Sequence, residues 1–212
     1  MIRRFDADNF HRLCDTLAKR DADLKRILAE HGHPKMWVRP NSFQTLILTI
    51  LEQQVSLAAA YAAFNRLKNR IGTVTPEKIA ALSDTELKNC YFTRQKIVYA
   101  RELTEAVRSK RIRLRALHHQ PDETVREQLI ELKGIGHWTI DVYLMHALRR
   151  TDLFPLGDIA LVNSLKRNKG LPDTVSKEKM LSVAEAWRPN RTIAAMILWH
   201  DYMNRRKVKV KD

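Results

Sequence analysis

Two glycines lie two residues apart in the stretch ELKGIGHWTIDVY, at Gly134 and Gly136, with helix-like sequence on both sides. Glycine permits a positive φ and lets other atoms approach the backbone closely, so the spacing predicts a tight hairpin between two helices. Backbone N–H groups at the start of the second helix could bind a phosphate, because the helix dipole favours an anion there. An ordinary turn between two helices explains the same glycines equally well.

A carboxylate follows at Asp158, in the stretch LFPLGDIALVNSLKR, where irregular Pro/Gly sequence gives way to an amphipathic helix. This position predicts that Asp158 caps the N-terminus of the helix. A carboxylate fixed at a helix start and facing a cleft could also stabilise a developing positive charge. The two roles are compatible, and we expect both.

The elements that position these residues are all predicted to be helices, because no segment alternates like a strand. We expect longer helices over about residues 43–52, 57–71, 94–107, 122–132, 137–149, 176–187 and 190–205, and shorter ones from Pro76 and after Ser83. Polar residues precede several of these segments and predict N-caps at Asn41 or Ser42, at Ser56 and at Thr93. The fold class is therefore all-α.

Proline-containing stretches predict where the chain divides, near Pro40 and near Phe154-Pro155. One helical lobe would then comprise residues 1–40 plus 155–212. The other would comprise residues 41–154 and carry the hairpin between its two helices, over about residues 123–149.

Charge is the strongest compositional feature, with 38 Lys and Arg against 24 Asp and Glu and a net charge of +14. A protein this basic commonly binds a polyanion such as nucleic acid, although a solvated basic surface without a partner is the alternative. The terminal RRKVKVKD could add non-specific attraction to phosphates. The two cysteines, Cys14 and Cys90, are expected to be reduced thiols. No signal peptide or membrane-spanning run is present, so we expect a cytoplasmic protein, nucleoid-associated if bacterial.

Four segments together resemble the HhH-GPD superfamily of DNA base-excision glycosylases. LKGIGHWTIDVYLMHAL followed by FPLGDIALVNSLK resembles the helix-hairpin-helix and catalytic-aspartate segments of that family. SFQTLILTILEQQVSLAAAYAAFNRL resembles its Q-Q-V-S loop, LSDTELKNCYFTRQKIVYARELTEAV its G-x-S-x-x-K segment, and AEAWRPNRTIAAMILWHDY its C-terminal W-x-P-x-R-x-x-A…W segment. The resemblance covers roughly residues 40–203 and is greatest to the alkylpurine branch, the 3-methyladenine DNA glycosylase II type.

The resemblance implies a fold of two helical lobes with the active-site cleft between them, and an enzyme that flips a damaged base out of the duplex. Asp158 would be the catalytic carboxylate. Bifunctional members carry a lysine two residues after the second hairpin glycine, where this chain has Trp138; Lys133 precedes the glycines and does not match. Without that amine no Schiff base is expected, so the enzyme would hydrolyse the N-glycosidic bond without cutting the strand.

Further sites follow from the same resemblance. Base-pocket candidates are Trp199, Trp138 and Tyr143, although tryptophan at helical spacing is usually core. DNA-binding candidates are Gln53, Gln54, Arg94, Lys96, Gly134, Gly136, His137, Trp138 and Thr139, with Gln54 as the side chain that fills the duplex. The alternative for Gln53 and Gln54 is that their amides cap helices. The alternative for Arg94 and Lys96 is that they lie on a solvated helix face. We expect no catalytic metal and no cofactor, except a monovalent cation, Na+ or K+, on hairpin carbonyls.

Departures from the family pattern limit what the resemblance implies about substrate. The segment that usually has a glycine before Ser-x-x-Lys reads Cys90-Tyr91-Phe92-Thr93 here, and Glu52 replaces a small residue before Q-Q-V-S. The expected function is excision of alkylated purines from double-stranded DNA by a monomer that does not bind membranes. The alternatives are a glycosylase for hypoxanthine, uracil or an oxidised base, and a non-catalytic DNA-binding protein.

Overall fold

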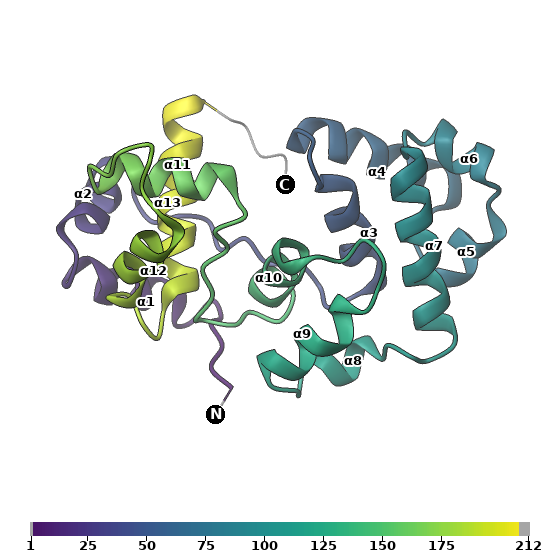
Figure 1. The fold of residues 1–212 in the computed structure, drawn as a ribbon, viewed down its shortest axis with the longest axis horizontal. Coiled ribbons are helices and arrows are strands. Elements are labelled where there is room, and N and C mark those ends of the chain that lie inside the picture. Colours follow the sequence, from purple (N-terminus) through teal and green to yellow (C-terminus); the bar gives the residue numbers. More distant parts are fainter. Residues whose placement is uncertain (1, 208–212) are drawn as a thin grey trace. The chain divides into compact units, whose positions relative to one another are not determined.

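The computed structural model describes residues 2–207. Residues 208–212, which end the predicted basic tail, lie outside the described residues. Thirteen helices and no strand occur in the described chain, apart from one isolated bridge between Arg4 and Arg150. The helices are α1 (Phe10–Ala18), α2 (Ala22–His31), α3 (Phe43–Glu52), α4 (Leu57–Ile71), α5 (Pro76–Ala81), α6 (Asp84–Asn89), α7 (Arg94–Arg108), α8 (Leu114–Leu117), α9 (Asp122–Ile130), α10 (His137–His146), α11 (Ile159–Asn168), α12 (Lys177–Glu185) and α13 (Arg191–Arg206). Figure 1 follows them along the chain. The all-α prediction is confirmed, although α1, α2 and α8 were not predicted.

Two compact units share these helices. The central unit is Arg39–Tyr143, and the terminal unit combines the chain up to Val38 with the chain from Leu144 onward. The first division lies close to the predicted break at Pro40, but the second falls inside α10 rather than after Phe154. The reason is a pair of long-range contacts. His146 Nδ1 lies 2.6 Å from the Trp37 carbonyl oxygen, and the Thr192 N–H donates to the Thr151 carbonyl at 2.8 Å. Both contacts attach residues before Phe154 to the terminal unit.

The core of the central unit is built around α3, which is buried along nearly its whole length. A helix that is apolar on all sides is stable only when other helices surround it, and α4 and α7 both pack against α3. Side-chain caps fix where these helices begin: Ser42 for α3, Ser56 for α4 and Thr93 for α7 each accept a backbone N–H three residues later. The predicted caps at Ser42, Ser56 and Thr93 are therefore confirmed.

In the terminal unit, α13 packs against α11, α2 and α1. Asp201 of α13 is completely buried and accepts hydrogen bonds from Asn168 at 2.9 Å, Ser164 at 3.3 Å and Arg205 at 2.5 Å. These donors outweigh the effect of burial and hold the pKa of the Asp201 carboxyl below its usual range. The buried carboxylate therefore ties α11 to α13.

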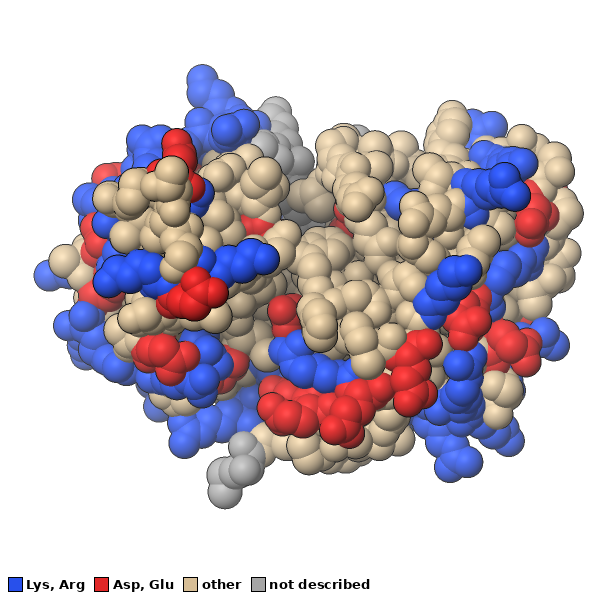
Figure 2. Space-filling view, viewed as in Figure 1, with Lys and Arg blue, Asp and Glu red and all other residues tan. Residues whose placement is uncertain are grey.

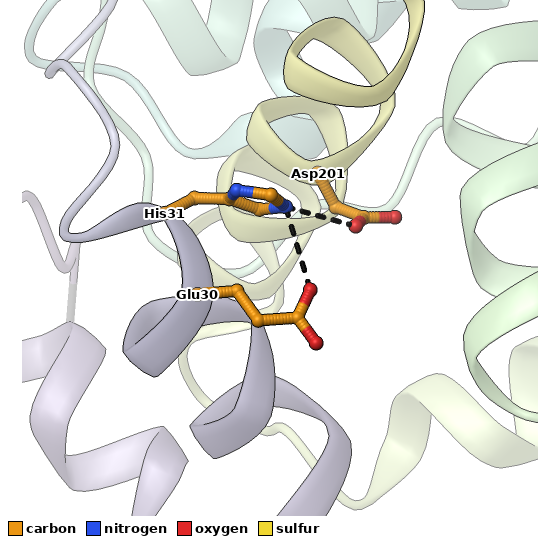
Figure 3. A group of neighbouring side chains, drawn as sticks. All are labelled: Glu30, His31 and Asp201. Carbon is orange, nitrogen blue, oxygen red and sulfur yellow. Dashed lines mark ion pairs between the residues drawn. The ribbon is translucent and has the colours of Figure 1, made fainter.

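The imidazole of His31 lies between two carboxylates, with Nε2 3.5 Å from Asp201 Oδ1 and 3.6 Å from Glu30 Oε2 (Figure 3). These three side chains come close enough to share a metal ion. However, the Arg205 guanidinium already contacts both carboxylates, at 2.5 Å from Asp201 and 3.2 Å from Glu30. We therefore interpret the cluster as an ion-pair network that joins α2 to α13.

A second network in this unit is centred on Asp21, the N-cap of α2. The indole N–H of Trp187 donates to Asp21 at 2.7 Å, and the Lys169 ammonium contacts the same carboxylate at 2.7 Å. Burial favours the neutral acid, but these donors prevail and lower the pKa of Asp21. Trp187 is only 1% exposed, so its role is to pack and to hold the N-terminus of α2.

Charge is distributed unevenly over the surface that Figure 2 shows, where acidic side chains gather over α9. Both cysteines lie in the described chain, are buried and form no disulfide, as expected, and burial raises the pKa of Cys14 to about 12. Within residues 2–207, no helix combines the length and the apolar character that crossing a membrane requires.

Candidate active site

Asp158 is the N-cap of α11, as predicted, and is half-buried. Its Oδ1 accepts the backbone N–H of Leu161 at 2.8 Å and the indole N–H of Trp199 at 3.0 Å. Both donors bind the same carboxylate oxygen and fix its direction at the start of α11. The terminal unit therefore holds the Asp158 carboxyl group in one orientation.

Trp199 reaches Asp158 from α13 and is 9% exposed. Its ring stacks on His146, with centroids 5.6 Å apart and planes at 23°. The Nδ1 of His146 lies 2.6 Å from the Trp37 carbonyl, and a carbonyl can only accept, so Nδ1 carries a proton. Trp37, His146, Trp199 and Asp158 thus form a continuous series of contacts. The sequence did not reveal His146, because it has no characteristic spacing to Asp158 or Trp199.

The hairpin lies between α9 and α10, in the central unit. Gly134 has φ +90°, and a Cβ atom there would lie 2.0 Å from the ring of Tyr99 on α7. Only glycine fits, because Tyr99 packs directly on the backbone. At Gly136 a Cβ would meet no atom of residues 2–207 within 4 Å, so no contact within this part of the chain requires glycine there. The hairpin prediction is confirmed, and the open space at Gly136 leaves the start of α10 accessible.

Gln53 connects the loop after α3 to this hairpin. Its side-chain N–H group donates to the Gly134 carbonyl at 2.8 Å and to Thr139 Oγ1 at 2.9 Å. The side chain therefore has a structural role that the sequence did not predict, and a contact with DNA stays a prediction. Gln54 beside it is exposed and adopts φ +56°, a conformation that glycine favours and most side chains avoid. The Gln54 side chain thus points outward from the loop, while the Gln53 side chain attaches the loop to the hairpin.

Two charged residues stabilise the end of α3 just before that loop. Glu52 is buried and forms two hydrogen bonds with Arg39, at 2.5 and 2.8 Å, which explains why a charged residue is tolerated there. The Lys96 ammonium donates to the Leu51 carbonyl at 2.6 Å, and burial lowers the pKa of Lys96. Lys96 therefore stabilises the C-terminus of α3 by binding a backbone carbonyl, while Arg94 is exposed at the start of α7. Their contacts with DNA stay predictions.

The remaining pocket candidates lie on α10. Tyr143 is 0% exposed, and its hydroxyl donates to Asn41 at 2.5 Å, so this structure places the ring in the core rather than on an accessible surface. Trp138 is half-buried in the first turn of α10, next to exposed His137 and buried Thr139. Stacking of a base on Trp199, Trp138 or Tyr143 stays a prediction.

Comparison with known proteins identifies the family. Residues 47–189 match the model of the HhH-GPD superfamily of base excision DNA repair proteins, which is more than half of the chain. The chain belongs to the HhH-GPD superfamily. The match includes the hairpin, Asp158 and the loop at Gln53 and Gln54.

Relatives of this HhH-GPD protein include two curated sequences and a solved structure. DNA-3-methyladenine glycosylase 1 of Schizosaccharomyces pombe is 31% identical, over 83% of this chain and 79% of that protein. YfjP of Bacillus subtilis, provisionally named a DNA-3-methyladenine glycosylase, is also 31% identical, over 83% of this chain but only 64% of its own length. The S. pombe 3-methyladenine DNA glycosylase Mag1, solved with abasic DNA, matches with a TM-score of 0.81 and 27% identity, over 95% of this chain and 100% of that one.

Proposed function

We propose that this HhH-GPD protein is a monofunctional DNA glycosylase that excises alkylated purines, of the 3-methyladenine and 7-methylguanine type, in base excision repair. One observation carries the proposal: the Asp158 carboxyl group is oriented at the N-terminus of α11 by the N–H groups of Leu161 and Trp199. The relatives named as 3-methyladenine glycosylases support the substrate class.

Cleavage of the glycosidic bond of an alkylated purine requires little more than an anion beside the sugar and a pocket for the base. Alkylation at N3 or N7 gives the purine a positive charge and makes it a good leaving group. As the glycosidic bond breaks, positive charge develops on the sugar, and a fixed carboxylate stabilises that charge. Asp158 would supply this carboxylate and orient the water that attacks the sugar. The flipped, cationic base would stack on an aromatic surface, for which Trp199 is the first candidate.

Double-stranded DNA is the proposed partner. Backbone N–H groups at the start of α10 would bind a phosphate, and Gln54 would fill the gap that the flipped nucleotide leaves. We expect a monomer to suffice, and a monovalent cation on hairpin carbonyls is an expectation of the same kind. We expect the protein to act in the cytoplasm, in association with the nucleoid if the source is bacterial.

The reaction would stop at base removal. Trp138 stands at the position where bifunctional relatives have a lysine, and an indole cannot form a Schiff base with the sugar. Borohydride should therefore trap no covalent complex between the protein and DNA. A trapped complex would contradict the monofunctional assignment.

The test is release of free bases from methylated genomic DNA, resolved by chromatography, with Asp158→Asn as the paired variant. Asparagine caps helices as well as aspartate does, so the fold should be retained while the negative charge is lost. We expect the native protein to release 3-methyladenine or 7-methylguanine and the variant to bind DNA without releasing either. Release by both proteins would refute the role of Asp158. If neither releases a base, duplexes with hypoxanthine, uracil or oxidised bases test the alternative substrates.

A further inference from the structure

Tyr91 combines two unfavourable properties at one position in the central unit. Its backbone has φ +64°, a conformation that favours glycine, and its ring is 60% exposed. An aromatic side chain in this conformation costs stability compared with glycine, and exposure of the ring returns none of that cost. A residue kept under these conditions is a candidate for contact with a ligand.

Arg66 on α4 holds the Tyr91 ring in place. The guanidinium carbon lies 4.8 Å from the ring centroid, and Nη1 donates to the tyrosine hydroxyl at 3.1 Å. Both side chains are exposed. The pair therefore presents a flat, positively charged surface, which is the type of surface on which nucleobases stack.

Tyr91 also lines a cavity of 250 Å³, here called the Tyr91 groove, together with Val55, Ala59, Ala62, Thr93 and Lys96 among others. Arg66 does not line it and acts on the groove through the Tyr91 ring. Its volume lies below the roughly 300–1,000 Å³ of pockets for drug-sized molecules, so it suits a single flat ring system. Alanine side chains of α4 line part of the groove. The lining is therefore mostly apolar, with polar groups at Thr93 and Lys96.

Lys96 supplies hydrogen-bond donors to the groove. An ammonium group has three N–H donors, and within the described chain Lys96 uses one, toward the Leu51 carbonyl. Every nucleobase has acceptor atoms on its edges, which such donors can bind. Figure 2 shows both basic and acidic side chains around α6 and α7, and the net charge of +14 of the chain favours a polyanionic strand over a cationic ligand.

The groove also lies beside the loop that carries Gln54. Val55 lines the groove, and its neighbour Gln54 is a second non-glycine residue with positive φ, at +56°. Two strained residues on one small surface indicate a site of function more strongly than either alone. If Gln54 enters the duplex as proposed, bases next to it lose their stacking partners within reach of the groove.

We propose that the Tyr91 groove binds one unstacked nucleobase of the bound DNA, with the Tyr91 ring, held by Arg66, as the stacking surface and Thr93 and Lys96 as donors to the edge of the base. The groove shares no lining residue with the base-pocket candidates Trp199, Trp138 and Tyr143. Its DNA ligand rests on the proposed function, but base binding here requires no catalysis.

The experiment uses a duplex with a stable abasic-site analogue and the fluorescent base 2-aminopurine, placed either opposite the analogue or one nucleotide away on either strand. Tyr91→Gly and Tyr91→Asn remove the ring with residues that tolerate a positive φ, and Tyr91→Phe is the matched control that keeps it. We expect the native protein and the Phe variant to quench 2-aminopurine at one of these positions. The Gly and Asn variants should not quench it and should bind about tenfold more weakly, the loss that one base–aromatic stack accounts for.

The melting temperature separates this outcome from misfolding, because Tyr91→Gly should melt at or above the native temperature. Equal affinity and equal fluorescence for native and Gly proteins at every position would overturn the inference while leaving base release by the native protein unaffected. If the native protein neither binds this duplex nor releases alkylated bases, the proposed function fails, and the inference fails with it.

Discussion

At the scale of single residues, Asp158 acquires its properties from its neighbours. The Leu161 N–H comes from the same helix and could be predicted from a local cap motif. The Trp199 N–H comes from α13 and depends on tertiary packing, which no local pattern encodes. The catalytic candidate was therefore predictable, whereas its orientation by Trp199 and the stacking of Trp199 on His146 were not.

The Trp199 donor can be removed without removing the ring. We expect Trp199→Phe to lower the single-turnover rate of base release by about tenfold or more, because a hydrogen bond to a charged group contributes about 1.5–3 kcal/mol. DNA affinity should change little. Trp187→Phe is the matched control, since it removes an indole N–H that binds Asp21 instead. It should lower thermal stability but not the rate, and an unchanged rate in Trp199→Phe would show that this donor does not support Asp158.

At the scale of elements, the two hairpin glycines are required for different reasons. Gly134 is required by the chain itself, since any side chain would collide with Tyr99 and its φ is positive. Gly136 has no such conflict. A close approach by something other than this chain, such as a phosphate, is the explanation that the proposed function gives for Gly136.

Alanine substitutions separate these reasons. Gly134→Ala should destabilise the protein by about 1–3 kcal/mol, through strain and overpacking against Tyr99. Gly136→Ala should leave the melting temperature nearly unchanged but weaken binding to duplex DNA by about tenfold, since a methyl group would separate the N–H groups of α10 from a phosphate. Calorimetry and fluorescence anisotropy measure the two effects. Native affinity in Gly136→Ala would argue against phosphate binding at this hairpin.

The boundaries of most elements were predictable because their determinants are local. Ser42, Ser56 and Thr93 each cap a helix through an N–H three residues away, a spacing that is visible in the sequence. The bonds from Gln53 to Gly134 and Thr139 cross 81 and 86 residues of chain. Such contacts depend on how the helices pack, so an internal role for Gln53 could not be predicted from local sequence.

At the scale of the whole molecule, the net charge of +14 could be read from composition, but the arrangement of charge could not. Acidic side chains gather over α9, while the buried carboxylate of Asp201 and the half-buried carboxylate of Asp21 form ion pairs within the terminal unit. The acidic residues are thus partly used in packing. A basic protein that stabilises itself with buried aspartates should lose stability when those aspartates are protonated.

The pH dependence of stability follows from the pKa of Asp201, which is lowered in the folded state because its donors outweigh burial. Its contribution is fully present above the pKa of an unfolded aspartate, about 3.9, and is lost as the pH falls through the lower folded value. Asp201→Asn should therefore cost about 1.5–3 kcal/mol of unfolding free energy at pH 7 and make the melting temperature fall less steeply below pH 4. Part of the acid dependence of the melting temperature should remain in this variant, because the pKa of Asp21 is also lowered in the folded state. The control is Asp173→Asn, whose side chain is fully exposed and should change neither quantity. An acid slope in Asp201→Asn as steep as in the native protein would mean that other carboxylates, not the network of α11 and α13, set the acid limit of the fold.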